Sequence, residues 1–254
     1  MRGLLSATQH DTLASAAAAT HSLVEVAGLA KAYGDETALG EVSFDIQPGE
    51  VLGIIGPNGA GKTTLLESLA GLIPVDNGIV CYRGRAVPAA RRRELIFYVP
   101  DGVKPYHDQY VAHVLAFFAA VYRVPAAAVA QTIVATGLAS VLGRRVGALS
   151  KGYGRRLLLA LGLLAPHELV LMDEPFDGFD LRQTRDIVTL LRAEAAKPRS
   201  LLLAIHQLAD AERVCDRFVL LSQGRMRGCG TLDDLRARTG RAGASLEEIF
   251  LALT

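Results

Sequence analysis

The sequence predicts an α/β fold built around a mostly parallel sheet, on the strength of three observations. Residues 51–55, VLGII, form a short apolar run after a Pro-Gly turn, as in a strand that is buried on both faces. Residues 169–172, LVLM, form a second run of this kind. Between them, residues 109–164 carry apolar side chains at helical spacing, so a largely helical block is expected between two strand-rich stretches.

The charge of the chain excludes a strongly basic or acidic protein. Its 254 residues carry a formal net charge of +1, which gives no reason to expect a nucleic-acid partner. Three arginine clusters, at residues 91–93, 144–145 and 155–156, are far apart in the sequence. We therefore interpret them as solvated faces; a phosphate-contacting patch is the alternative.

Cysteine usage and hydropathy indicate a reduced, cytosolic environment and no membrane span. The three cysteines are odd in number, and neither they nor the six histidines show metal-ligand spacing. The longest apolar run, Leu157 to Pro166, is far shorter than the roughly 20 residues of a membrane helix. Any role at a membrane is therefore expected to come through a partner chain.

The N-terminal part divides into a tail and a strand-rich segment. Residues 1–21 are rich in Ala, Ser and Thr, and polar residues interrupt the apolar stretch that a secretory signal needs, so a disordered tail or a mis-assigned start is expected. Residues 23–26 and 42–46 alternate apolar and polar side chains, which predicts strands with one buried face. Residues 31–35 are interpreted as a turn that carries Tyr33, which by itself indicates packing.

A glycine-rich loop follows the first buried strand and precedes a helical pattern. It is the strongest functional signal in the chain, because it fits the phosphate-loop pattern G-x-x-x-x-G-K-[ST]. Its residues are Gly56, Pro57, Asn58, Gly59, Ala60, Gly61, Lys62, Thr63 and Thr64. The glycines allow backbone N–H groups to form an anion nest at the positive end of a helix. Lys62 is expected to reach the β- and γ-phosphates and Thr63 to ligand Mg²⁺; the alternative is a turn that binds nothing.

The middle of the chain continues with strands and then helices. Residues 79–83 and 95–99 predict two strands, and the second ends at Pro100-Asp101-Gly102. Residues 126–136 predict a helix that breaks at Gly137. Ser150 is expected to cap a further apolar helix, because its hydroxyl can accept from a first-turn N–H.

Two acidic residues and a histidine follow predicted strands directly. Asp173 and Glu174 end the second buried strand, where buried charges would be costly and where ligands of open α/β sheets collect. Asp173 is therefore a candidate for the Mg²⁺ shell and Glu174 a candidate base for an attacking water. After a helix that is expected to end near Lys197, the strand at 201–205 leads to His206, a site candidate once a phosphate site is predicted.

The C-terminal tail carries two capping boxes. Thr231 with Asp234 and Ser245 with Glu248 each have the spacing of a helix start. The second predicted helix has an apolar stripe at Leu246, Ile249, Phe250 and Leu253. We expect this stripe to dock on its own domain; a subunit contact is the alternative.

Taken in order, these features resemble one family, the ATP-binding subunit of ABC transporters, over residues 23–254. Residues 56–63 resemble its Walker A loop and residues 169–174 its Walker B strand. Residues 149–153, LSKGY, resemble its signature loop, usually LSGGQ, and lie about 20 residues before Walker B. The resemblance implies roles for further residues, which are Ser150, Lys151 and Gly152 in the signature loop, Asp180 in the D-loop, His206 as the switch histidine and Tyr33 as the aromatic that stacks on adenine.

The resemblance also implies an architecture and partners. The expected fold is a P-loop NTPase core with a mostly parallel sheet, an antiparallel β subdomain and an α-helical subdomain inserted at about residues 102–165. The ATPase domain is expected at residues 22–230, with a helical extension at residues 231–254. Two copies would sandwich two ATP molecules, with Mg²⁺, between one Walker A loop and the other's signature loop. Separate integral-membrane permease subunits are the implied partners, and the implied location is the cytoplasmic face of the membrane.

The chain departs from the family pattern at two points. Asp101 stands where the family usually has a Gln that touches Mg²⁺ and the water; an aspartate could still ligand the metal but adds repulsion toward the γ-phosphate. Lys151 and Tyr153 change the signature loop, a change that we expect to be tolerated. The end of the chain, residues 245–254, resembles export-type subunits, which suggests a direction of transport but no cargo.

Three alternatives remain, the first of which is an inactive regulator; the presence of both Glu174 and His206 argues for turnover instead. A soluble ABC ATPase that acts on nucleic acid or ribosomes would resemble tandem cassettes or carry long coiled-coil inserts, whereas this chain has one Walker A loop and no heptad run. A small-molecule kinase could use the same phosphate loop, but it would not need the signature loop or Glu174 together with His206.

Overall fold

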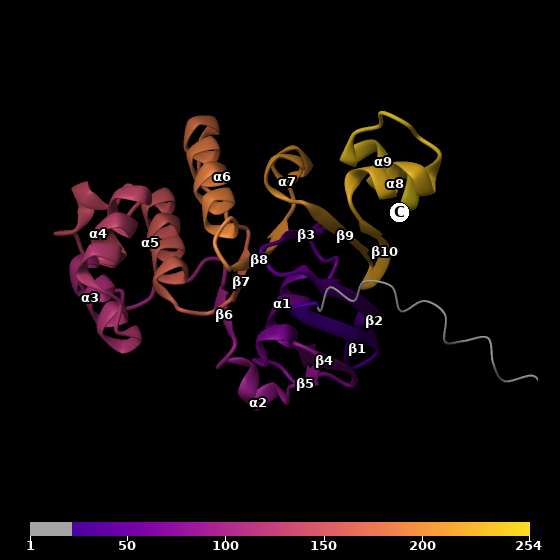
Figure 1. The fold of residues 1–254 in the computed structure, drawn as a ribbon, viewed down its shortest axis with the longest axis horizontal. Helices are drawn as coiled ribbons and strands as arrows, with labels where there is room; N and C mark the ends of the chain where they lie inside the picture. The colour runs from indigo at the N-terminus through magenta and orange to yellow at the C-terminus, as the bar shows by residue number, and fades with distance from the viewer. Residues whose placement is uncertain (1–21) are drawn as a thin grey trace, which may run out of the picture.

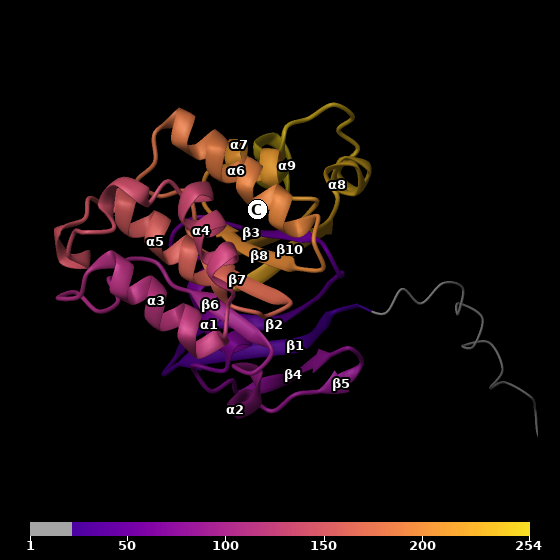
Figure 2. The same ribbon diagram turned by 60° about the vertical axis from the view of Figure 1, so that its left-hand side comes forward.

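The computed structural model describes residues 22–254, so the tail predicted at residues 1–21 lies outside the described residues. Within this part of the chain, a central six-stranded sheet separates two layers (Figures 1 and 2). A four-stranded antiparallel sheet lies on one side of it, and helices α6 (Leu181–Ala195), α7 (Leu208–Val214) and α9 (Leu246–Leu253) lie on the other. A group of three helices, α3 to α5, extends from one end. This arrangement confirms the predicted α/β class with a mostly parallel sheet and a separate antiparallel one.

The central sheet is parallel except at one edge. In spatial order its strands are β10 (Arg225–Gly230), β9 (Arg217–Ser222), β3 (Val51–Ile55), β8 (Ser200–Ile205), β7 (Leu169–Asp173) and β6 (Ile96–Val99). All neighbours pair in parallel apart from β10, which returns antiparallel to β9. The carboxyl ends of β3, β8, β7 and β6 therefore lie along one edge of the sheet.

The side chains of the central strands alternate between two apolar cores. In β3, Leu52 and Ile54 face the core shared with the antiparallel sheet, whereas Val51 and Ile55 face the opposite core. Because both faces are covered, the strand reads as a continuous apolar run in the sequence. The second core is closed by helices α6 (Leu181–Ala195) and α7 (Leu208–Val214).

The antiparallel sheet covers the first core together with helix α1 (Lys62–Ala70). Its strands are, in order, β2 (Glu36–Ile46), β1 (Val24–Tyr33), β4 (Asn77–Tyr82) and β5 (Arg85–Ala86), and the short α2 (Ala89–Arg92) follows them. The turn predicted at residues 31–35 is wrong in extent, because β1 continues to Tyr33 and pairs it with Glu36. Irregular register along β1 breaks the simple alternation that would have shown its length.

The helices between β6 and β7 have a core of their own. They are α3 (Val111–Tyr122), α4 (Ala126–Ala135) and α5 (Lys151–Leu164), with two 3₁₀ turns at Ala139–Val141 and Val146–Ala148. Buried residues of α3 and α5, such as Leu115 and Leu161, pack together, and α4 contributes half-buried side chains. Helix α5 also packs on the central sheet, because its Leu158 and Leu159 lie in the second core with Val99 of β6 and Val170 of β7, whereas α3 and α4 lie on the outer side of α5 (Figures 1 and 2).

The C-terminal helices α8 (Leu232–Thr239) and α9 (Leu246–Leu253) pack on the second core. Both begin with the predicted capping boxes. Leu246 and Ile249 are fully buried against that core, and Phe250 and Leu253 are half-buried, so the apolar stripe docks on its own chain. The strands β9 and β10 and helix α7, which precede α8, were not predicted from the sequence.

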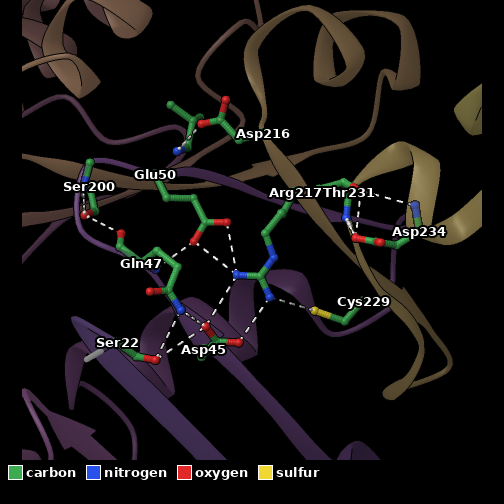
Figure 3. Close-up of polar contacts among 12 residues, drawn as sticks. Ser22, Asp45, Gln47, Glu50, Ser200, Asp216, Arg217, Cys229, Thr231 and Asp234 are labelled. Carbon is green, nitrogen blue, oxygen red and sulfur yellow. Dashed lines mark hydrogen bonds and ion pairs between the residues drawn. The ribbon is translucent and has the colours of Figure 1, made fainter. Parts of the chain in front are cut away.

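A polar cluster joins the antiparallel sheet to the central sheet (Figure 3). Arg217, the first residue of β9, donates to Asp45 at 3.1 Å and to Glu50 at 3.1 Å. Glu50 also accepts from the backbone N–H of Gln47 at 2.7 Å. Burial raises the pKa of Glu50; burial also raises that of Asp45, but the hydrogen bond and charge of Arg217 outweigh it and lower the Asp45 pKa. The cluster fixes the chain where β2 leads into β3.

Candidate nucleotide-binding site

The candidate site lies at the edge of the central sheet where four parallel strands end. The phosphate loop follows β3, Glu174 follows β7, His206 follows β8 and Asp101 lies two residues after β6. Because β3, β8, β7 and β6 are neighbours, the order of strands gathers residues that are far apart in the sequence.

The phosphate loop presents an uncapped helix start. Gly61, at the N-terminus of α1, adopts a left-handed backbone with φ of 100°, and no side chain caps the first turn. The first-turn N–H groups are thus directed at the loop, as an anion site requires. A Cβ at Gly56 would collide with the backbone oxygen of Leu221, whereas Gly59, at φ of 80°, has nothing within 4 Å of such a position.

Lys62 lies across this loop. Its side chain is only 6% exposed, and its Nζ donates to the carbonyl oxygens of Gly56 at 2.8 Å and Pro57 at 3.3 Å. The same nitrogen is 3.7 Å from Glu174 Oε1. The ammonium group of Lys62 therefore lies between the carbonyl oxygens of the loop and the carboxylate of Glu174.

Thr63 and Asp173 supply neighbouring oxygen atoms. The Thr63 hydroxyl donates to Asp173 Oδ2 at 2.7 Å. Burial raises the pKa of Asp173, against the effect of the Thr63 hydrogen bond, and the nearby carboxylate of Asp101 raises it further. A hydroxyl and a carboxylate are oxygen donors of the kind that Mg²⁺ prefers.

These two residues fit a metal that is completed by a ligand. Among residues 22–254, no group of three or more His, Cys, Asp or Glu side chains is arranged to hold a metal ion. Mg²⁺ is commonly held by one or two protein oxygens together with phosphates and water. The pair of Thr63 and Asp173 matches that pattern.

Glu174 and His206 form a second pair beside Lys62. Glu174 has a left-handed backbone with φ of 48°, and its N–H donates to the carbonyl oxygen of Ala204 at 3.0 Å. Its Oε2 is 2.5 Å from His206 Nδ1. Since a carboxylate accepts, Nδ1 carries the proton, and the opposite ring nitrogen is directed away from Glu174.

One cavity of about 890 Å³ connects these groups. Of the predicted site residues, those that line it are Tyr33, Asn58, Gly59, Gly61, Lys62, Thr63, Thr64, Asp101, Asp173 and Glu174. Tyr33 is half-exposed at its rim. Gly56, Pro57 and Ala60 form the loop behind this lining, and His206 contacts it through Glu174. The volume is in the range of small-molecule and cofactor sites.

The predicted signature residues lie outside that lining. Ser150 caps α5 by accepting from the N–H of Tyr153 at 3.4 Å. Lys151 forms an ion pair with Asp177 at 2.6 Å, and Gly152 packs against the backbone of Gly178. Asp180 caps α6 by accepting from the N–H of Gln183 at 2.8 Å. These residues do not meet the phosphate loop of the same chain around the cavity.

The expectation that the arginine clusters are solvated is wrong at two positions. Arg92 is 5% exposed and donates to the carbonyl oxygens of Ser68 and Val87. Arg155 is 4% exposed and forms an ion pair with Asp101. Sequence reasoning missed Arg155; the signal available was its place one helical turn before Leu158 and Leu159, which are buried.

Comparison with known proteins agrees with this geometry. Residues 39–177 match the family described as ABC transporter. An ABC transporter ATP-binding protein of Methanocaldococcus jannaschii, itself uncharacterized, is 32% identical over 84% of this chain and 79% of its own length. The Nod factor export ATP-binding protein I of Ralstonia nicotianae is 33% identical over 90% of this chain and 72% of its own.

Solved structures give the same result. The structure of an ATP-binding subunit of an ABC transporter is 31% identical, with a TM-score of 0.83 over 91% of this chain and 99% of that one. An ATP-binding cassette in its ADP conformation shares the fold, with a TM-score of 0.74 at 21% identity over 91% of this chain and 98% of that one. The chain therefore belongs to the ABC transporter family, as an ATP-binding subunit that carries the ATPase domain of that family.

Proposed function

We propose that this chain binds ATP with Mg²⁺ in the cavity of the phosphate loop, hydrolyses it as a head-to-tail homodimer, and powers export through separate membrane subunits. The observation that carries the proposal is the convergence of Lys62, the Thr63–Asp173 pair and the Glu174–His206 pair on one cavity edge. Lys62 and Thr63 begin α1, Asp173 and Glu174 lie at the end of β7, and His206 follows β8, so the fold brings together residues that are far apart in the sequence.

In the proposed mechanism, each group has one task. The first-turn N–H groups of α1 and the ammonium of Lys62 bind the β- and γ-phosphates, while Tyr33 stacks on the base at the rim. Thr63 and Asp173 would hold Mg²⁺, which supplies charge neutralisation on the phosphate oxygens when bound. Glu174 orients a water and accepts its proton. His206 donates from its outer ring nitrogen to the γ-phosphate when both of its ring nitrogens carry a proton.

The proposed dimer explains why the signature residues lie away from the cavity. Ser150, Lys151 and Gly152 of one copy would cover the phosphates bound by the other, with Asp180 at the same interface. An interface of this kind is isologous, so each copy supplies both halves. Residues 22–230, with the helices at residues 102–165 as an insertion, would form the ATPase domain, and residues 231–254 its extension.

A role in transport would need a membrane partner. Among residues 22–254, no helix combines the length and apolar character of a membrane span. The proposed partners are integral-membrane permease subunits, which would hold this chain at the inner face of the membrane. Export as the direction is supported by relatives named for Nod factor export, at 33–36% identity.

The test is hydrolysis by the purified chain and by a Glu174→Gln variant. The wild type should release phosphate from MgATP, and the variant should be slower by about a hundredfold or more, as for loss of a general base. Because hydrolysis reopens the dimer, the variant should also elute as a dimer with MgATP and as a monomer without it in size-exclusion chromatography.

A matched control is Glu94→Gln, since Glu94 forms an exposed pair with Arg91 away from the cavity. This variant should hydrolyse ATP at the wild-type rate and should not be trapped as a dimer. A Glu174→Gln protein that stays monomeric and still hydrolyses ATP at the wild-type rate would refute the proposal.

A further inference from the structure

An ion pair between Asp101 and Arg155 joins two parts of the molecule at the edge of the cavity. Asp101 lies in the loop after β6, and Arg155 lies in the second turn of α5. The Arg155 guanidinium is 4% exposed, and its Nη1 also donates to the backbone oxygen of Asp173 at 3.2 Å. One buried cation thus contacts both the loop and the end of β7.

The cavity is lined by more acidic than basic side chains, so neutralisation of Asp101 by Arg155 matters for nucleotide binding. In the described part of the chain, the side chains that line the cavity include five carboxylates, from Glu36, Glu67, Asp101, Asp173 and Glu174, and a single cation, Lys62. A triphosphate brings further negative charge, and like charges a few ångströms apart repel strongly where water is excluded. A free carboxylate at position 101 would oppose the binding of the nucleotide.

Building on the proposed function, we propose that Arg155 is a positioning residue that neutralises Asp101 and keeps its carboxylate away from the metal and the γ-phosphate. The ion pair occupies Oδ1 of Asp101, and Asp173 with Thr63 remains as the oxygen pair for the metal. The metal-ligand role that the sequence left open for Asp101 is therefore assigned to Asp173 and Thr63 alone.

The same cation connects the cavity to the loop proposed to act on the second subunit. Arg155 is five residues after Ser150, or about 7–8 Å along the helix. Since Arg155 also contacts the backbone of Asp173, the start of α5 is tied to the strand end that holds the metal-ligand carboxylate. The pair thus fixes the loop after β6, the end of β7 and the start of α5 relative to one another.

The test is a double-mutant cycle on ATP binding, with Arg155→Gln, Asp101→Asn and the combined variant. Binding of a fluorescent ATP analogue is measured with and without Mg²⁺, and melting temperature reports folding. Arg155→Gln should weaken binding about tenfold in both conditions, because it frees a carboxylate next to the phosphates; tenfold is about 1.4 kcal/mol, within the coupling range of contacting residues. Adding Asp101→Asn should restore affinity to within about threefold of the wild type.

Arg156→Gln is the matched control on the same helix. Arg156 donates to the backbone oxygen of Thr136 at 2.9 Å and forms no ion pair with a carboxylate among the described residues. Its effect on binding should therefore add to that of Asp101→Asn, with no rescue.

Three outcomes separate this inference from the proposed function. A wild type that neither binds nor hydrolyses ATP would overturn both. A wild type that hydrolyses ATP, with additive Arg155 and Asp101 effects, would overturn the inference alone. If Arg155→Gln does not fold, ATP binding by the Asp101→Asn variant tests the inference instead. It should bind ATP as tightly as the wild type or more tightly, and weaker binding only with Mg²⁺ would make Asp101 a metal ligand and overturn the inference.

Discussion

The ionised carboxylate of Asp173 lowers the stability of the fold, although the proposed function needs its negative charge. It is 3% exposed, and burial raises the pKa of its carboxyl above the usual value. A raised carboxyl pKa means that the folded state binds the proton more tightly than the unfolded state, so ionisation of Asp173 at neutral pH destabilises the fold. The stability that the protonated form would give is present at low pH and is lost as pH rises. The Thr63 hydrogen bond and the charges of Lys62 and Arg155 offset only part of this cost, and a bound metal ion would offset more of it.

Replacing Asp173 by Asn is expected to stabilise the protein while abolishing hydrolysis. The amide oxygen can still accept from Thr63, and the buried charge is removed. Melting temperature should rise by about 2–4 °C for each kcal/mol gained. The gain should shrink as pH is lowered toward the pKa of Asp173, where the wild type becomes protonated.

Asp177→Asn is the control, because the opposite effect on stability is expected for this variant. The hydrogen bond from Lys151 lowers the pKa of Asp177, so its charge favours the folded state and its neutralisation should not raise the melting temperature. An Asp173→Asn variant that melts below the wild type at pH 7 would show that the carboxylate is stabilising, contrary to the burial argument.

At the scale of elements, the cluster around Arg217 fixes the position of the antiparallel sheet relative to the central sheet. Glu50 is 6% exposed at its side chain and accepts from both Arg217 and the backbone of Gln47. Since a buried carboxylate without its cation is costly, the cluster depends on Arg217. The path of the chain from β2 into β3, and so the position of the phosphate loop that follows, depends on it as well.

The Arg217→Met variant should lower the free energy of unfolding by about 3 kcal/mol, at the low end for a broken buried pair because Asp45 is a third exposed. The loss should be smaller in acid. The stability that Arg217 gives through Asp45 is present above the unfolded pKa of Asp45 and is lost as pH falls through its lowered folded pKa. Denaturant unfolding at pH 7 and at about pH 2.5, below the ordinary value of 3.8 for the Asp45 carboxyl, measures both effects.

Arg83→Met serves as the control, because Arg83 pairs with Glu168 at the surface, with both side chains about half-exposed. It should cost less than about 1 kcal/mol. Equal losses for the two variants would mean that the Arg217 cluster contributes no more than a surface ion pair.

Local sequence patterns predicted the elements with a clear period and missed the others. The runs at β3 and β7 are apolar throughout because both faces of the sheet are covered. Strand β9 has a run of the same kind at residues 218–221, which could have predicted it, whereas β10 is rich in Arg and Gly and shows no apolar run or alternation. The Arg155–Asp101 pair joins positions 54 residues apart, and no local pattern reports such a contact.

At the scale of the whole molecule, the proposed mechanism depends on two half-sites that come from different copies of the chain. The motifs predicted which residues belong to the site, but the proposed contact of Ser150 is with a second copy. In one chain, Ser150 caps α5 and lies outside the lining of the cavity that contains Lys62. Composite sites of this kind make a distinctive prediction for mixtures of two defective chains.

A mixture of Lys62→Ala and Ser150→Asp chains should hydrolyse ATP although each alone does not. Lys62→Ala removes the cation of the phosphate loop, and Ser150→Asp keeps a good helix cap but places a negative charge toward the partner's γ-phosphate. In a mixed dimer, the intact phosphate loop of one chain faces the intact Ser150 of the other. At equal mixing, half of the dimers are mixed and each has one intact site, so about a quarter of the wild-type rate is the upper expectation.

Phosphate release is measured against total chain concentration, with differently tagged chains to count mixed dimers. Full activity of Ser150→Asp alone, or no recovery when mixed dimers are present, would contradict a site shared between two copies.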